Sequence, residues 1–247
     1  MTMNEDLIYL SDIDEKRFSI KTAKAADIRM DNISAIMQSC ADQEVVLLIA
    51  RCPTYDLKTV QKMEQLGFLL MDTIIYFNYD LLSKPMVEDI DCIHIRTVRA
   101  GEENAVRSVA QEAFKGYLGH YHADNRLDRD RCDEVYMDWA YRSCISSETA
   151  DVVLVSEHGG KIVGFGTIRI NNPMEGEGML FGVAPPCQGK GVYRGIMKGC
   201  INWCTKKGLH RMIISTQITN VASQKVWSRL GFEPNGSLYT FHKWFIS

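Results

Sequence analysis

A glycine-rich turn, "VAPPCQGKGVYRGI" at residues 183–196, carries the clearest chemical signal in the chain. It follows the apolar run "GMLFGV" and leads into a helical pattern, so it joins a strand to a helix. Gly189 and Gly191 allow backbone conformations that other residues avoid, and the first amides of a helix have no partners within it. Such a turn can bind phosphate through its amides, and Lys190 and Arg194 add positive charge nearby.

The residues themselves exclude two kinds of phosphate-binding motif. A nucleoside-triphosphate loop needs serine or threonine after its lysine to bind Mg²⁺, but Gly191 follows Lys190 here. A dinucleotide fingerprint belongs to an early strand–helix–strand unit, whereas this turn comes late and follows Pro185 and Pro186. The pyrophosphate of coenzyme A and a plain tight turn both remain open.

The composition is that of a globular protein. The chain has 247 residues, 46% hydrophobic residues and a formal net charge of −3. It lacks a long basic run, so we expect no nucleic-acid partner. It also lacks an apolar stretch of the ~18–20 residues that would span a bilayer, and its acidic N-terminus does not resemble a signal peptide, so we expect a cytoplasmic protein without a membrane partner.

Eight cysteines are scattered along the chain without a Cys-x-x-Cys pair. Cytosolic thiols stay reduced, and a zinc site would need a recognisable ligand spacing. We therefore expect reduced, structural cysteines and no metal.

Alternating strand and helix patterns predict an α/β protein with a mixed sheet. Residues 1–86 hold a helix at "DNISAIMQSC", an apolar strand at "EVVLLIARC", a helix that stops at Gly67 and a long strand. The stretch 81–91 is the best candidate for a linker. Residues 87–247 then hold a strand, two helices, a hairpin at 151–170, the glycine turn and a final strand–helix–strand unit.

The two segments share one internal repeat. A shift of 164 residues places Leu66-Gly67-Phe68 on Leu230-Gly231-Phe232 and Asp56 on Asn220. Any strand–helix–strand unit that ends in glycine could produce this match. The alternative is that residues 1–86 are a degenerate half-copy of the C-terminal fold.

"VAPPCQGKGVYRGIM" and "STQITNVASQKVWSRLGF" together resemble the two cofactor motifs of the GNAT N-acetyltransferase superfamily. Gln188 and Gly191 match the first motif, and Asn220 with the "LGF" at 230–232 matches the second. The resemblance runs from residue 92 to the C-terminus. It implies a GNAT fold with an N-terminal, partly GNAT-like α/β extension.

This resemblance implies acetyl-CoA as the cosubstrate, bound where the strand of Leu180–Val183 splays from the strand of Ile213–Thr216. The amide of Val183 would polarise the acetyl carbonyl, and Asn220 would bond the pantetheine arm. The cofactor-binding residues implied are Leu180, Phe181, Gly182, Val183, Gln188, Gly189, Lys190, Gly191, Val192, Tyr193 and Asn220.

Two positions depart from the family pattern. Tyr193 stands where the glycine motif has a small residue, and Trp227 stands where the family has a tyrosine that protonates the leaving thiolate. An indole N–H donates a hydrogen bond but does not give up its proton. Trp227 could pack against the thioester, while Tyr239, Tyr193 or Ser223 could act as the acid. A thiolate with a pKa of about 8.5 could also leave without one.

A polar and aromatic stretch at residues 116–140, which includes a loop between two predicted helices, is the candidate acceptor site. Loops on rigid scaffolds often carry binding groups, and a histidine can take the ammonium proton. The proposed residues are His120, Tyr121, His122, Asp124 and Arg126, with His122 as the catalytic base and Glu177 as its alternative. A surface segment with ordinary hydrogen-bonded histidines, and a merely solvated Glu177, are the competing interpretations.

A narrower resemblance links the chain to dTDP-fucosamine acetyltransferases. It is carried by the long N-terminal segment ending "EQLGFLLMDTIIYFN", the stretch "YLGHYHADNRL" and the strand end "TQITN". It implies a nucleotide-linked amino sugar as acceptor. The function expected is therefore acetyl transfer from acetyl-CoA to the primary amine of a small molecule, by a monomer or homodimer. The alternative is a non-catalytic acyl-CoA-binding or regulatory module, which the replacement by Trp227 would explain.

Overall fold

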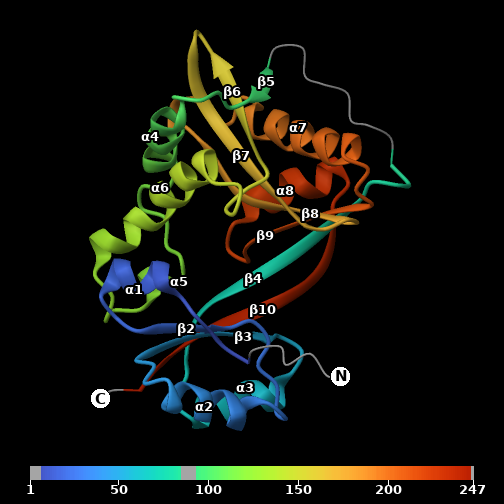
Figure 1. Ribbon diagram of the computed structural model, residues 1–247. Helices are drawn as coiled ribbons and strands as arrows, with labels where there is room; N and C mark the ends of the chain where they lie inside the picture. The colour runs from blue at the N-terminus through green and yellow to red at the C-terminus, as the bar shows by residue number, and fades with distance from the viewer. Residues whose placement is uncertain (1–6, 85–92, 246–247) are drawn as a thin grey trace. The chain divides into compact units, whose positions relative to one another are not determined.

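The computed structural model describes residues 7–84 and 93–245, which divide into two compact units (Figure 1). The first unit draws on the segments 1–75, 118–132 and 236–247, and the second on 76–117 and 133–235. Strands β4 (Leu69–Asp80) and β10 (Glu233–Trp244) each contribute residues to both units. The units are therefore interleaved in sequence, whereas the expected division was a single boundary at residues 86 and 87. Of the expected linker at 81–91, residues 85–91 lie outside the described residues.

The sheet of the first unit has the strand order β1-β2-β3-β10, in which β2 and β3 are parallel and the other neighbours antiparallel. Its other elements are β1 (Tyr9–Leu10), α1 (Asp12–Phe18), β2 (Thr22–Ala25), α2 (Ile33–Asp42), β3 (Leu47–Pro53), α3 (Leu57–Gln65) and α5 (His120–Ala123).

Strand alternation divides the side chains of this sheet between two faces. Ala23, Ala50 and Phe241 face the apolar core under α2 and α3, which the helical spacing of Ile33, Ile36 and Cys40 correctly predicted. The neighbouring strand residues face the other way. They are Lys24 on β2, Arg51 on β3 and His242 on β10. Three ionisable side chains thus share the second face.

The sheet of the second unit has the order β4-β9-β8-β7-β6-β5, with β8 and β9 parallel and β5 to β8 antiparallel. Its elements are β5 (His94–Thr97), α4 (Glu103–Ala113), α6 (Arg129–Ile145), β6 (Val152–His158), β7 (Lys161–Asn172), β8 (Glu175–Val183), the 3₁₀ turn η1 (Pro185–Cys187), α7 (Val192–Lys206), β9 (Arg211–Gln217) and α8 (Val221–Leu230). Parallel and antiparallel pairs occur together, so the mixed α/β prediction is confirmed.

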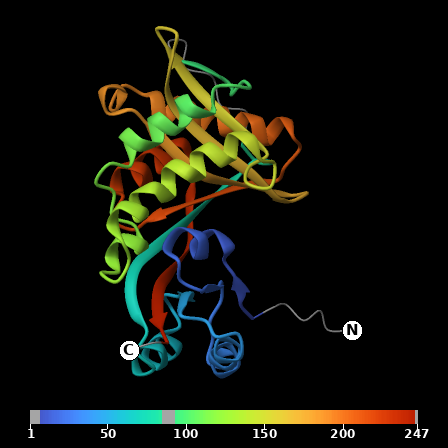
Figure 2. The ribbon, with the colours of Figure 1, turned by 60° about the vertical axis from the view of Figure 1, so that its left-hand side comes forward.

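Helices cover both faces of this second sheet (Figure 2). Phe165 of β7 lies in the core with Val106 of α4 and Ala140 of α6. On the other face, a Cβ at Gly166 would lie 2.7 Å from Cγ2 of Ile196, so α7 packs directly on the backbone of β7. Glycine on that face brings α7 close enough for its first turn to reach the end of β8.

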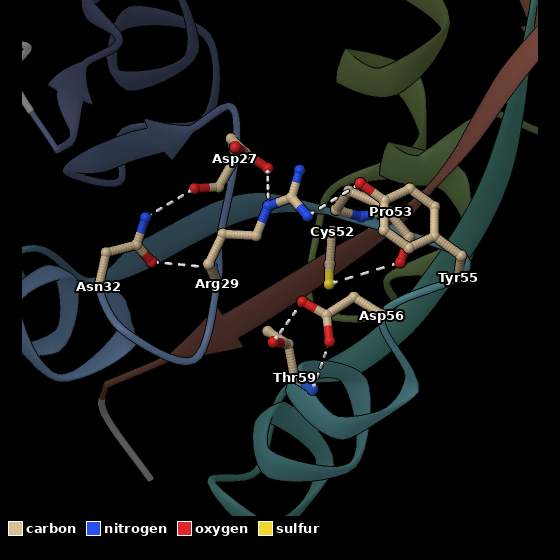
Figure 3. Close-up of polar contacts among 8 residues, drawn as sticks. All are labelled: Asp27, Arg29, Asn32, Cys52, Pro53, Tyr55, Asp56 and Thr59. Atoms are coloured by element: carbon tan, nitrogen blue, oxygen red, sulfur yellow. Dashed lines mark hydrogen bonds and ion pairs between the residues drawn. The ribbon is translucent and has the colours of Figure 1, made fainter.

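The strand–helix motif predicted to repeat is present in both units. Asp56 accepts a hydrogen bond from the amide of Thr59 (3.2 Å) and so caps α3 (Figure 3). Asn220 accepts from the amide of Ser223 (3.3 Å) and caps α8 in the same way. Each cap lies at the carboxyl end of a strand, β3 in the first unit and β9 in the second.

The two helices also end alike. Gly67 and Gly231 have positive φ angles of 78° and 95°. Phe68 donates its amide to the carbonyl of Met63, and Phe232 donates to that of Trp227, each at 3.0 Å. The correspondence covers cap, buried helix residue, glycine and phenylalanine. That residues 1–86 are a degenerate half-copy of the C-terminal fold stays a prediction.

Candidate functional site

Strand β8 loses its neighbour β9 partway along. The parallel ladder runs from Glu175–Arg211 to Gly178–Ile214. At the same place the register with β7 shifts, because Thr167 pairs with Leu180 while Ile168 pairs with Gly178. The bulge bends β8, and the amide of Leu180 bonds the side-chain oxygen of Thr167 (3.0 Å). The four predicted residues Leu180–Val183 therefore continue beyond the ladder.

The turn after β8 is fixed to the end of that strand. The side-chain amide of Gln188 donates to the carbonyl of Val183 (3.0 Å). Gly189 and Gly191 have φ angles of 72° and 84°, in the left-handed region that favours glycine. Nothing lies within 4 Å of a Cβ built at Gly189. Glycine therefore allows the backbone conformation there and leaves the turn accessible, and packing does not require it.

The first turn of α7 presents unpaired amides. Gly191 is the N-cap, and the first helical bond runs from the amide of Gly195 to the carbonyl of Gly191 (2.9 Å). The amides of residues 192–194 precede it and lack helical acceptors. With the exposed Lys190 and Arg194, they make a positively polarised end suited to an anion.

Gly195 is a packing glycine. A Cβ there would lie 2.9 Å from Cγ2 of Ile93, so the glycine lets α7 pack against the residue before β5. The loose Gly-x-Gly-x-x-x-Gly pattern therefore combines two conformational glycines and one steric glycine.

Asn220 uses both ends of its side-chain amide within the second unit. Its oxygen caps α8, and its nitrogen donates to the hydroxyl of Thr216 on β9 (3.0 Å). The amide is thus held at the carboxyl end of β9, the strand from which β8 has separated.

Trp227 and Tyr193, the two departures from the family pattern, are bonded to each other. The buried indole of Trp227 donates to the hydroxyl of Tyr193 (2.9 Å) and packs edge-on against Phe77. Ser223 is a second hydrogen-bond partner of that hydroxyl. Burial raises the pKa of Tyr193, so the phenol keeps its proton at neutral pH.

The other two proposed acid–base residues lie elsewhere. Glu177 accepts a hydrogen bond from Asn171 (2.9 Å) and pairs with Ile213 inside the β8–β9 ladder, before the strands separate. Tyr239 belongs to the first unit, where it packs against the core under α2 and α3.

Within the predicted acceptor segment, His120–Ala123 form the short helix α5 in the first unit, where a loop was expected. Tyr121 is buried and donates its hydroxyl to Asp14 (2.9 Å). His122 caps the helix, because its Nδ1 accepts from the amide of Gly119 (3.2 Å). The guanidinium of Arg126 lies over the ring of Trp244 (5.3 Å).

His120 and Asp124 meet at His242, a residue that the sequence did not single out. His120 Nδ1 lies 3.0 Å from His242 Nε2, and His242 Nδ1 lies 2.7 Å from Asp124 Oδ2. Trp244 donates its indole N–H to the same carboxylate oxygen (2.8 Å). The alternation of "LYTFHKWF" could have pointed to His242, because it puts His242 and Trp244 on one face of the strand.

The seven cysteines in the described ranges are all free. Within residues 7–84 and 93–245, His, Cys, Asp and Glu side chains form no group of three or more that could hold a metal ion. None of the helices in those ranges is both long and apolar enough to cross a membrane.

Comparison with known proteins identifies the type of domain. Residues 112–232 match the family model described as "Acetyltransferase (GNAT) family". The chain is 25% identical over 146 residues to the spore coat polysaccharide biosynthesis protein SpsD of Bacillus subtilis, which covers 58% of this chain and 48% of that protein. It is 24% identical over 147 residues to the mycothiol acetyltransferase of Arthrobacter sp. strain FB24, covering 58% and 43%. The chain thus covers less than half the length of either relative.

Among solved structures, the chain resembles a "GCN5-related N-acetyltransferase" from Sphaerobacter thermophilus. The TM-score is 0.64 at 14% identity, over 96% of this chain and 76% of the other. At this identity the likeness concerns the fold alone.

Proposed function

Because residues 112–232 belong to the GNAT family of acetyltransferases, we propose that the protein transfers the acetyl group of acetyl-CoA to the primary amine of a small molecule. One observation carries the proposal. Strand β8 runs past its last pair with β9 and ends in the glycine turn that opens α7. A free strand edge followed by an anion-binding helix end suits an amide-bearing chain with a pyrophosphate at one end.

The residues of β8 and α7 suit coenzyme A by their chemistry. The edge of Leu180–Val183 offers backbone groups to the pantetheine amides, and the amides from Gln188 to Tyr193 face the pyrophosphate. Lys190 and Arg194 add charge that opposes that of the phosphates. Asn220 bonds the pantetheine arm by exchanging or sharing its contact with Thr216. Bound acetyl-CoA supplies an acetyl thioester, which is open to attack by a neutral amine.

The chain has three tasks in this reaction. It removes a proton from the acceptor ammonium, polarises the acetyl carbonyl through the amide of Val183 and accommodates the leaving thiolate. The hydroxyl of Tyr193 accepts a 2.9 Å hydrogen bond from Trp227, which stands at the position of the missing tyrosine, and is therefore a candidate acid. His122 and Glu177 are candidate bases, each with a present hydrogen-bond partner to exchange.

A nucleotide-linked amino sugar is the acceptor class that we propose. The name of the relative SpsD places that protein in polysaccharide biosynthesis, and the stretch "YLGHYHADNRL" resembles dTDP-fucosamine acetyltransferases. Arg51 and Lys24 lie close enough to His120 to act on its charge, and such cations also favour an anionic acceptor.

A non-catalytic acyl-CoA-binding module is the second candidate. The hydrogen bond between Trp227 and Tyr193 favours this candidate, because the indole N–H already donates to a side chain of the protein. A module of this kind would bind CoA and leave amines unchanged.

Measuring free thiol release and CoA affinity together distinguishes the acetyltransferase from the non-catalytic binding module. Acetyl-CoA is incubated with a panel of amines that includes nucleotide-linked 4-amino sugars, and CoA binding is measured by calorimetry. Thiol release with at least one amine supports the transferase. CoA binding without release across the panel, together with turnover restored by Trp227→Tyr, supports the binding module.

A further inference from the structure

Strand β8 changes phase by one residue at Met179, within the second unit. Gly178 pairs with Ile168 of β7, whereas Leu180, two residues on, pairs with the residue next to Ile168. Met179 is therefore the extra residue of a β-bulge. A slip of one residue exchanges the two sides of a strand, because successive residues face opposite ways.

The side chains of β8 show this change directly. Phe181 follows Gly178 by three residues, a spacing that puts two residues on opposite faces of a regular strand. Here both are on the face covered by α7, because a Cβ added at Gly178 would lie 2.8 Å from the ring of Phe181. That ring packs edge-on against Tyr193 of α7, with 6.0 Å between the centroids. Leu180 packs on the other face, in the core with α4 and α6. The bulge therefore exchanges the faces of the strand.

The backbone amides of β8 follow the same change. Leu180 donates its amide to Oγ1 of Thr167 (3.0 Å), and Ala184 donates to a backbone carbonyl of β7 (2.9 Å). Both amides thus point toward β7, and strand alternation turns the amides of Phe181 and Val183 to the opposite side. On that side the ladder with β9 has already ended. Without the slip, the neighbouring residues would present their amides to this open edge instead.

Thr167 stabilises the slipped register. Its side chain is fully buried and Leu180 is 5% exposed, so water does not readily replace the hydroxyl as acceptor for the Leu180 amide. A buried amide that has lost its acceptor destabilises the conformation that buries it. Position 167 therefore needs a side-chain oxygen, which threonine and serine have and valine lacks.

We propose that Thr167 is a positioning residue for acetyl-CoA. Its hydroxyl holds the slipped register, and this register points the amides of Phe181 and Val183 at the cosubstrate. The inference rests on the proposed acetyl transfer and adds the side chain that aims the backbone donors of that site. The Phe181 amide bonds the pantetheine arm, and the Val183 amide stabilises the acetyl oxygen, which gains negative charge when the amine attacks. Thr167 acts only through the strand.

The first test compares Thr167→Val, which removes the hydroxyl at nearly constant volume, with Thr167→Ser, which keeps it. Thr167→Val should weaken CoA binding about tenfold or more and lower kcat, because the edge that binds the cosubstrate loses its register. Thr167→Ser should stay within about threefold of wild type in both. Thr205→Val is the matched control, since it removes a hydroxyl that bonds a carbonyl within α7 (3.0 Å), and it should leave CoA binding unchanged. Calorimetry measures binding, and urea denaturation measures any loss of stability separately.

The second test follows single amides by hydrogen exchange and needs no turnover. In the wild-type protein, bound CoA should slow exchange at Phe181 and Val183 and leave Leu180, which already has its bond to Thr167, unchanged. Thr167→Val should make the Leu180 amide exchange faster. Protection of Leu180 by CoA in place of Phe181 and Val183 would overturn the inference.

The possible outcomes separate the role of Thr167 from the proposed function. Wild-type affinity for CoA in Thr167→Val, or a Thr167→Ser variant as weak as Thr167→Val, overturns the role of Thr167 alone. If Thr167→Val does not fold, Thr167→Ser and the exchange pattern of the wild-type complex decide. Wild-type protein that binds no CoA refutes the proposed function, and the inference with it.

Discussion

The indole N–H of Trp227 and the hydroxyl of Tyr193 form a 2.9 Å hydrogen bond that ties helix α8 to the first turn of α7. In the sequence, the two residues were separate departures from the acetyltransferase pattern. The bond makes them partners, since an indole can only donate and a buried phenol oxygen accepts. The two helices that it joins are those that carry Asn220 and the glycine turn.

Removing the Tyr193 hydroxyl should cost stability through Trp227. Tyr193→Phe leaves the buried indole N–H unpaired, which costs about 1–3 kcal/mol in the free energy of unfolding. Urea denaturation measures the loss. Tyr55→Phe removes a hydroxyl from an exposed tyrosine and should change stability by less than about 0.5 kcal/mol.

A double-mutant cycle shows whether the two residues act through their bond. If they do, Tyr193→Phe should cost less when Trp227 is already phenylalanine, because no donor is left unpaired. Equal costs in both backgrounds would contradict a coupling through this bond.

Gly189 and Gly208 allow backbone strain to be separated from ligand binding. Both have positive φ, 72° and 75°, and neither has an atom within 4 Å of an added Cβ. Substitution by alanine should therefore cost the same in each, about 1 kcal/mol. Only Gly189 lies in the turn before α7, so only Gly189→Ala should weaken CoA binding. Calorimetry and urea denaturation of both variants check this, and equal CoA affinities would argue for a plain turn.

Asn220 can be tested as a helix cap and as a ligand separately. Asn220→Ala removes the cap on α8 and should cost about 1 kcal/mol, whereas Asn220→Ser keeps a capping oxygen and should cost a few tenths. Both lose the amide that we assign to pantetheine, so both should bind CoA several-fold more weakly. Wild-type CoA affinity in Asn220→Ser would limit the residue to capping.

Local features of the fold could be predicted from the sequence because their causes are local. The stop of α3 at Gly67 depends on a left-handed φ that glycine adopts most easily, and the stripe of Ile33, Ile36 and Cys40 follows helical geometry. The glycine turn before α7 was likewise readable, since Gly189 and Gly191 have the positive φ angles that their spacing suggested.

Contacts between distant residues were not readable in this way. His120 and His242 are 122 residues apart in the sequence. The alternating pattern of β10 accounts for His242 without any contact to a distant residue. The interleaving of the units has the same origin, because β10 pairs with β3 along Leu238–Trp244 and joins the C-terminus to the first unit. Only sheet pairing, which a local pattern does not specify, brings these residues together.

Glu102 should make the stability of the second unit depend on pH. It accepts two 2.8 Å bonds from Arg96, which also pairs with Glu157 and so links β5, β6 and the start of α4. Arg96 and the amide of Arg99 lower the pKa of Glu102 from 4.5 to about 2. Because the folded pKa is depressed, this stabilisation is complete above pH 4.5 and is lost as the pH falls toward 2.

Glu102→Gln should therefore be less stable than wild type at pH 7, and the difference should shrink between pH 4.5 and 2. Solvent still screens this partly exposed bridge, so the difference should stay small. Urea denaturation at a series of pH values measures it. Glu103→Gln removes a charge from the same helical turn but leaves the Arg96 bridge in place. If the two variants follow the same pH curve, helix-end charge accounts for the effect and the bridge does not.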